Sequence, residues 1–190
     1  GPHLHFDFRD TKTENIINPL LFGFVIYVID KYRPNVNSIM VYPLNDTIAV
    51  NNEFKAQSIS LSTNSEGNYV TNKITANGAI GFSVNTFDNM TNPYNKNGIY
   101  KVSTFVNGVP YFSYKFDTFS FDESKHINYF MDYFRFKSLG QRFQKMFIDN
   151  DYPLSIVNQN KKDGILKVQP SANYTYKIVV EDFSQNKSTI

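Results

Sequence analysis

Two histidines on either side of a single residue, His3 and His5, are the residues whose types and spacing point most directly to chemistry. Side chains in a β-strand alternate between its two faces, so an extended backbone places both imidazoles on one face. Leu4, Phe6 and Phe8 fall on the other face, which requires a core. Imidazole nitrogens bind zinc and also carry protons near neutral pH. The spacing therefore predicts a strand that supplies part of a zinc site.

The residues around this pair extend the motif. Gly1-Pro-His-Leu-His-Phe6 is followed by Asp7 and Arg9, and the segment up to Leu20 contains an Asn-Pro pair ahead of an apolar stretch. Over residues 1–24 the chain resembles the last motif and exit segment of the LytM or lysostaphin-like zinc metallopeptidases, which hydrolyse peptide cross-links in bacterial peptidoglycan. The resemblance implies that His5 is a metal ligand and that His3 is the neighbouring catalytic histidine. Asp7 stands where the family commonly has Glu.

The resemblance also implies that the zinc site is shared with residues outside this sequence. The family's other two ligands come from a His-x-x-x-Asp motif that lies far upstream of the histidine pair. The one remaining histidine, His126, has no partner at ligand spacing. We therefore expect the chain to be the carboxyl-terminal part of a zinc endopeptidase and to be inactive by itself. Zn²⁺, the one cofactor implied, would bind only together with the upstream ligands.

Length, charge and cysteine content limit the other function classes. A chain of 190 residues is long enough for one sizeable core with an appendage. A net charge of +2 is too small to indicate a nucleic-acid partner. The absence of cysteine excludes a disulfide framework and thiolate catalysis within the chain. The most apolar stretch, Leu20 to Ile29, is about half the length of a transmembrane helix, so we expect no transmembrane segment in this chain.

Residues 36–190 predict an antiparallel, Ig-like β-sandwich. Short runs with alternating apolar residues are separated by clusters of Asn, Asp, Gly, Pro and Ser, which is typical of this class. The expected strands cover residues 39–42, 54–61, 69–76, 79–87, 99–106, 109–116 and 174–181.

Asn107-Gly108 predicts a two-residue hairpin, because both residues tolerate the positive φ of a type I′ turn. Pro110 lacks a backbone donor, so it should lie at an edge or face outward. Asp163-Gly164 predicts a second, weaker turn between the segments on either side.

One region, Ser120 to Ile148, interrupts the strand pattern. Ser120-Phe-Asp-Glu123 and Ser138-Leu-Gly-Gln141 both match the capping box at a helix start. Around and after the second box, apolar residues recur at helical spacing and would cover one face: Leu139, Phe143, Met146 and Phe147. We predict one or two short helices packed against the sandwich.

A second resemblance covers most of residues 36–190. Asn97-Gly-Ile-Tyr-Lys-Val102, Val106-Asn-Gly-Val-Pro-Tyr111 and Val180-Glu-Asp-Phe-Ser184 are similar to segments of the accessory β-sandwich that follows the peptidase domain in enzymes of Bacteroidetes-type bacteria. Together the two resemblances divide the chain into a remnant of the peptidase domain (1–24), a connecting strand or linker (25–35) and the accessory sandwich (36–190). They also place the parent enzyme in the periplasm or cell envelope, with its export signal upstream.

Other patterns have simpler interpretations. Four acidic residues between 117 and 132 could include a catalytic pair, but Asp122 and Glu123 suit a helix start. The stretch Asp88 to Asn97 lacks the alternating acids of a calcium loop, which favours a plain surface loop. Basic and aromatic residues alternate between Tyr133 and Lys145, and there we expect core aromatics with a charged rim rather than nucleic-acid binding.

One alternative function is carried forward. It is a non-catalytic envelope protein, either a degenerate peptidase that regulates a partner or a sandwich whose many tyrosines bind cell-wall glycans. The sequence indicates neither the cross-link that would be cut nor the oligomeric state.

Overall fold

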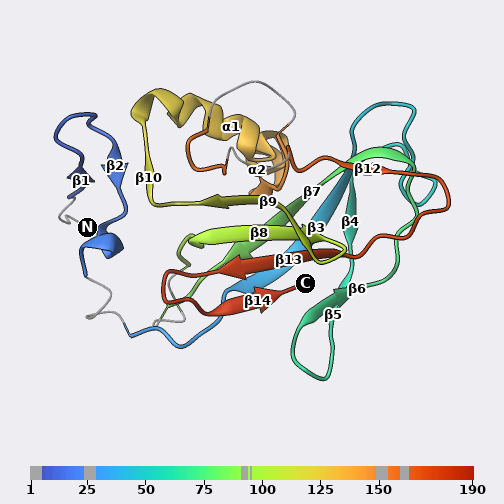
Figure 1. Cartoon of the computed structure of the whole chain (residues 1–190), viewed down its shortest axis with the longest axis horizontal. Helices are drawn as coiled ribbons and strands as arrows, with labels where there is room; N and C mark the ends of the chain where they lie inside the picture. Colours follow the sequence, from blue (N-terminus) through green and yellow to red (C-terminus); the bar gives the residue numbers. More distant parts are fainter. Residues whose placement is uncertain (1–5, 24–28, 91–93, 95, 149–153, 159–162) are drawn as a thin grey trace.

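The computed structural model describes residues 6–23, 29–90, 94, 96–148, 154–158 and 163–190. Strands make up 41% and helices 13% of the structure, and the sheets are antiparallel. Two of these sheets form the layers of a sandwich (Figure 1). The predicted all-β, sandwich-like class is therefore confirmed.

The first layer is organised around one long strand with alternating apolar residues. In β7 the side chains of Ile80, Phe82 and Val84 are all buried, because they share one face of the strand. The strand order is β11-β7-β3-β4, and β12 also pairs with β7. Its strands are β3 (Asn35–Pro43), β4 (Gln57–Ile59), β7 (Gly78–Phe87), β11 (Phe143–Lys145) and β12 (Leu166–Val168). The strands predicted over residues 39–42 and 79–87 lie within β3 and β7.

The second layer has the order β14-β13-β8-β9. Its strands are β8 (Lys101–Val106), β9 (Val109–Lys115), β13 (Tyr176–Glu181) and β14 (Lys187–Thr189). The predicted hairpin joins β8 to β9, with φ of 51° at Asn107 and 78° at Gly108. Pro110 is exposed on β9, the edge strand of this sheet. Its missing backbone N–H therefore removes no hydrogen bond to a further strand. Both features agree with the sequence prediction.

The two layers enclose one hydrophobic core. Val41 and Val84 of the first layer and Val102 and Val180 of the second are all fully buried in it. Phe82 stacks on Tyr176 across the layers, with ring centroids 4.3 Å apart. Gly81 has no side chain where the ring of Phe147 crosses the sheet: a Cβ there would lie 2.8 Å from Cγ of Phe147. The core therefore depends on residues from distant parts of the chain.

Two predicted strands are shorter than expected. Residues 54–61 contribute β4 and the start of β5 (Leu61–Thr63), and residues 69–76 contribute only β6 (Tyr69–Thr71). β5 and β6 pair with each other as a two-stranded hairpin that projects from the sandwich (Figure 1).

The segment after β9 contains the predicted short helices. Ser120 caps the 3₁₀ helix η3 (Phe121–His126), with its hydroxyl accepting from the N–H of Asp122. Asp122 and Glu123 lie in its first turn, as expected. Helix α1 (Ile127–Phe130) follows directly, and Phe130 is buried against Tyr114.

The second predicted helix start is wrong. Asp132, not Ser138, is the N-cap of α2 (Tyr133–Leu139), and its carboxylate accepts from the N–H of Arg135. Gly140 ends this helix with φ of 66°, because glycine adopts the left-handed conformation without strain. Phe143 therefore lies in strand β11, where it pairs with Asn85 of β7.

The predicted turn at Asp163-Gly164 does not join its neighbours into a hairpin. β12 pairs with β7, whereas Val157 bridges to Tyr114 of β9. Among the residues of the described ranges, no helix has both the length and the apolar character required to cross a membrane.

Candidate functional site

The histidine pair predicted to bind zinc, His3 and His5, lies outside the described residues, and so do residues 25–28 of the expected connecting strand or linker (25–35). Residues 29–34 form no strand, and β3 begins at Asn35. The structure begins at Phe6, directly after the pair. Phe6 is 66% exposed, and its ring meets that of Phe8 edge to face at 5.9 Å. Phe8 is half-buried and stacks on Phe22 at 4.6 Å. The apolar side of the motif is therefore only partly covered.

The motif continues into a tight hairpin. β1 (Phe8–Arg9) pairs with β2 (Ile16–Ile17), and a carboxylate oxygen of Asp10 accepts from the N–H groups of Lys12 and Thr13 in the connecting turn. These hydrogen bonds hold the pKa of Asp10 below its usual value. The guanidinium of Arg9 binds the carboxylate of Asp7 at 2.8 Å and lies over the ring of Phe121, 4.7 Å from its centroid.

This hairpin is attached to the sandwich by a third strand. β2 pairs with β10 (Thr118–Phe119), and the hydroxyl of Thr118 donates to the carbonyl of Ile16. Figure 1 shows the resulting small sheet at one end of the molecule, beside the two main layers. The residues that follow the histidine pair therefore have a fixed position relative to the sandwich.

Asn18 completes the attachment. Its side-chain oxygen accepts from the N–H of Leu20 and so caps the 3₁₀ helix η1 (Pro19–Phe22), while its amide nitrogen donates to the carbonyl of Phe116 at 3.0 Å. No residue of η1 is buried. The apolar stretch after the Asn-Pro pair is therefore held by the polar contacts of Asn18 and by the stacking of Phe22 on Phe8.

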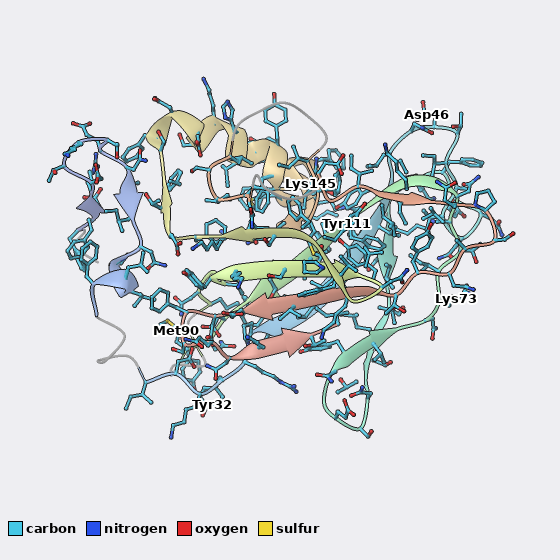
Figure 2. All side chains as sticks on the ribbon, in the orientation of Figure 1. Tyr32, Asp46, Lys73, Met90, Tyr111 and Lys145 are labelled. Atoms are coloured by element: carbon cyan, nitrogen blue, oxygen red, sulfur yellow. The ribbon has the colours of Figure 1, made fainter. Side chains whose placement is uncertain are left out.

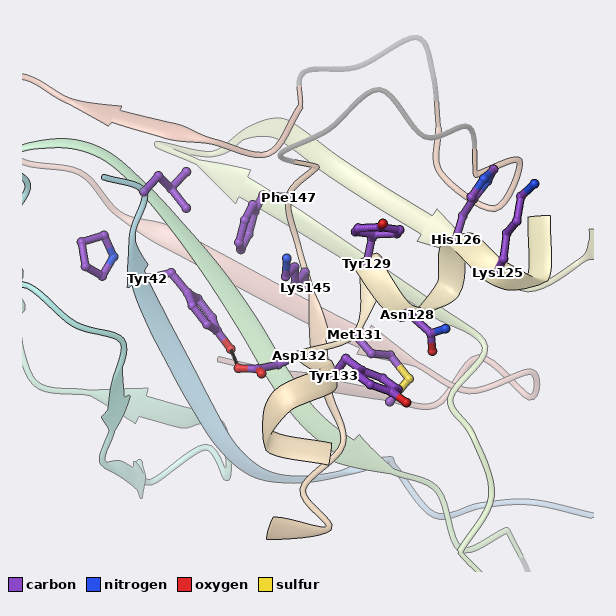
Figure 3. A pocket seen from close by; sticks show the side chains of 12 residues that line it. Tyr42, Lys125, His126, Asn128, Tyr129, Met131, Asp132, Tyr133, Lys145 and Phe147 are labelled. Carbon is purple, nitrogen blue, oxygen red and sulfur yellow. Dashed lines mark hydrogen bonds between the residues drawn. The ribbon is translucent and has the colours of Figure 1, made fainter. Parts of the chain in front are cut away.

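An open pocket of about 1000 Å³ lies between β3, β11 and the helical segment (Figure 3). Tyr42 lines it from the sheet, and Lys125, His126, Tyr129 and Tyr133 line it from the helices. Pockets of several hundred cubic ångströms with aromatic walls and a few polar groups are usual for small-molecule sites. No local pattern in the sequence predicts this pocket, because its walls come from segments far apart in the chain.

A partly buried polar network forms one wall of the pocket. The hydroxyl of Tyr42 donates to the carboxylate of Asp132 at 2.9 Å and shares a second hydrogen bond with the hydroxyl of Ser83. Arg135 binds the same carboxylate through Nε at 3.2 Å. Burial, with the nearby charge of Asp132, raises the pKa of Tyr42 well above its usual value. The network therefore keeps Tyr42 protonated and in a fixed orientation.

The remaining wall is basic and aromatic. Lys125 and Lys145 contribute ammonium groups, and Tyr129 is 46% exposed at the rim. Lys145 lies over the ring of Phe147, 5.3 Å from its centroid. Such surfaces stack on sugar rings and attract anionic groups. The pocket is thus suited to binding a polar or anionic ligand.

Three of the four acidic residues near the helices bind separate structural partners. Asp117 bonds to Tyr100 and Lys115, whereas Asp132 bonds to Tyr42 and Arg135. A carboxylate oxygen of Glu123 accepts from the N–H and the hydroxyl of Ser155. Each of these three carboxylates therefore has its own structural partners.

The expected core position of the aromatic residues in the basic segment is wrong for two of them. Phe143 is buried, but Phe134 is 76% and Tyr133 45% exposed. Both exposed rings lie on α2, which packs with one side only. Arg142 lies over the ring of Phe136, 5.4 Å from its centroid.

Comparison with known proteins gives one match. No curated protein and no solved structure is significantly similar to the chain. The matching family model covers residues 53–153, which includes the helical segment and most of the pocket wall. Since this is more than half of the 190 residues, the chain belongs to that family, whose function is uncharacterised.

Proposed function

We propose that the chain is the carboxyl-terminal part of a zinc metalloendopeptidase that hydrolyses the peptide cross-links of bacterial peptidoglycan in the periplasm or cell envelope. The sandwich, in this proposal, positions the last strand of the catalytic domain. The observation that carries it is the sheet β1-β2-β10, which joins the residues directly after His3 and His5 to the sandwich. The resemblance of residues 1–24 to LytM-type peptidases supplies the chemistry.

The exposed aromatic side chain at the start of the hairpin supports the same assignment. Phe6 is 66% exposed although it belongs to the apolar side of the motif. A large exposed aromatic residue next to a paired strand suits packing against further strands. In the proposed enzyme, the remainder of the catalytic domain covers this residue.

The two histidines have different proposed roles. His5 holds zinc together with two ligands from the upstream part of the protein, and His3 moves a proton or steadies the reacting amide. Zinc in such sites acts as a Lewis acid and lowers the pKa of water to about 7.

The test uses the full-length protein with its upstream residues. Zinc content is measured by mass spectrometry, and activity by release of peptides from purified peptidoglycan. His5→Ala should lose stoichiometric zinc and activity, whereas His3→Ala should retain most of the zinc and lose activity. Lys12→Ala, in the exposed hairpin turn, is the matched control and should behave as the unmodified protein. Retention of stoichiometric zinc by His5→Ala would reject the assignment.

A second candidate is a non-catalytic envelope protein that binds cell-wall glycans, and the pocket of Figure 3 favours it. Its test is co-sedimentation of the 190-residue chain with purified peptidoglycan. Tyr129→Ala should weaken binding about tenfold if the ring stacks on a sugar. Tyr32→Ala is the control, because Tyr32 is 62% exposed and does not line the pocket. Equal sedimentation of both variants would exclude the pocket as the binding site.

A further inference from the structure

Three aspartates from distant parts of the chain meet at one end of the sandwich. Asp30 precedes β3, Asp88 follows β7, and Asp182 follows β13. One carboxylate oxygen from each lies within 4.8 Å of the other two. Figure 2 shows this end of the molecule near the labels Tyr32 and Met90, each two residues beyond one of the aspartates.

Two of these carboxylates are buried without a counter-charge. Asp88 and Asp182 are each 3% exposed, and Asp30 is partly exposed. No ion pair of the described residues involves any of the three. Burial, together with the charges of Asp30 and Asp182, raises the pKa of Asp88 to about 6. Burying negative charges close together is costly unless a cation balances them.

One oxygen of the cluster is also left without any hydrogen bond. Oδ1 of Asp88 is buried and has no partner. A buried polar atom without a partner is rare in folded proteins and calls for a ligand or a water molecule. The unsatisfied oxygen belongs to a carboxylate that lies within reach of the two others.

Hydrogen bonds to the surrounding backbone hold the cluster in place. Asp88 and Asn97 exchange two backbone hydrogen bonds, of 3.0 and 2.7 Å. The carboxylate of Asp182 accepts from both the N–H and the side-chain amide of Asn186. That amide also donates to the carbonyl of Asp30 at 3.2 Å. The three carboxylates are therefore held together by contacts that do not neutralise their charge.

We propose that Asp30, Asp88 and Asp182 form a binding site for one calcium ion. Calcium takes six to eight oxygen ligands at about 2.3–2.6 Å, so two oxygens on one ion lie at most about 5 Å apart. The spacing within the cluster meets this limit without movement of the backbone. Three carboxylates supply the negative charge that a divalent ion requires, and backbone carbonyls and water supply the remaining ligands in such sites.

The site would have a structural role. Asp30 lies in the connection between the N-terminal hairpin and β3, whereas Asp88 and Asp182 follow strands of the two different layers. A bound ion therefore ties this connection to both layers of the sandwich. The inference does not depend on the peptidase proposal, since it uses neither histidine nor zinc.

The test measures the melting temperature of the 190-residue chain in excess chelator and in calcium chloride, together with calorimetric titration of calcium. At a free calcium concentration about 100 times the Kd, binding should raise Tm by about 5–10 °C. Asp88→Asn removes one ligand charge and also relieves the repulsion in the cluster. The Tm of this variant should be higher than that of the unmodified chain in chelator and lower than it in calcium. Such a reversal is specific to a bound ion.

The control and the contrary outcomes are defined by the same measurements. Asp46→Asn, at an exposed aspartate, should leave the calcium-induced rise unchanged. Asp182→Asn provides a second ligand variant if Asp88→Asn does not fold. The absence of a Tm rise with calcium, an equal rise in both ligand variants, or a rise with magnesium but not calcium would each overturn the site. None of these results would affect zinc binding by His5.

Discussion

The backbone N–H of Asn18 donates to the carbonyl of Asp117 at 2.7 Å, which joins the exit of the N-terminal hairpin to the strand that leaves the sandwich. The same asparagine caps η1 and reaches the carbonyl of Phe116. One residue thus fixes the end of a segment that carries the proposed catalytic motif. Its backbone and side-chain hydrogen bonds add to the pairing of β2 with β10, which attaches the hairpin to the sandwich.

Replacing this side chain should loosen the hairpin. Asn18→Ala removes the cap of η1 and the hydrogen bond to Phe116, and each loss costs about 1 kcal/mol. Hydrogen exchange of amides in β1 and β2 should accelerate, whereas exchange in β7 and β13 should not change. Asn15→Ala is the control in the same hairpin, because the side chain of Asn15 makes no hydrogen bond within the described part of the chain. Uniform acceleration throughout the protein would contradict a local role.

Local signals in the sequence predicted much of the fold. Asn107-Gly108 fixed the β8–β9 hairpin, because few dipeptides tolerate two positive φ values in succession. The buried alternation of Ile80, Phe82 and Val84 located β7. These features depend on neighbouring residues, and neighbouring residues are what a single sequence displays.

The errors arose where distant contacts decide the structure. The apolar spacing from Leu139 to Met146 fits a helix, but Gly140 ends α2 and the next residues pair with β7. The aspartate cluster was missed for the same reason: Asp88 stood in a stretch that resembled a surface loop, and its partners Asp30 and Asp182 come from other segments. The spacing of residues along the chain carries no information about contacts between distant segments.

The network at the pocket wall should contribute to stability. Tyr42→Phe removes the hydroxyl that joins Asp132 to Ser83, and Ser83 is fully buried. Leaving that serine without its partner should lower the free energy of unfolding in urea by about 1–3 kcal/mol. Tyr133→Phe, which removes a hydroxyl from a 45% exposed side chain that lines the same pocket, is the control and should cost less. Equal losses in the two variants would show that the network adds nothing.

A single methyl group at Gly164 should destabilise the protein. Gly164 has φ of 82°, and an added Cβ would lie 2.7 Å from Cα of Phe147 and still closer to the carbonyl of Met146. Left-handed strain and the clash with the backbone together should cost Gly164→Ala about 2–5 kcal/mol of unfolding free energy. Gly98→Ala is the control, since a Cβ there meets nothing within 4 Å and its φ is not positive. Chemical denaturation of both variants gives the comparison.

The carboxylate of Asp117 should make part of the stability depend on acid pH. Burial raises the pKa of Asp117, but hydrogen bonds from Lys115 and Tyr100 and the charges of Lys115 and Lys101 outweigh burial and lower it below its usual value. A carboxyl whose pKa is lower in the folded state binds fewer protons there than in the unfolded chain. Its contribution is therefore complete above its unfolded pKa of about 3.9 and is lost as the pH falls through the folded value.

Asp117→Asn isolates this contribution. The variant should be less stable than the unmodified protein at pH 6. The difference should shrink as the pH falls through the lowered folded pKa of Asp117, because the carboxyl is then protonated and both proteins are uncharged at this position. Asp122→Asn, at an exposed residue of η3, is the matched control. Its free energy of unfolding should follow that of the unmodified protein across the pH range more closely than that of Asp117→Asn does. Free energies of unfolding in urea from pH 6 to pH 2.5 measure the effect. A difference that is constant across this range would mean that Asp117 acts through its hydrogen bonds alone and not through its charge.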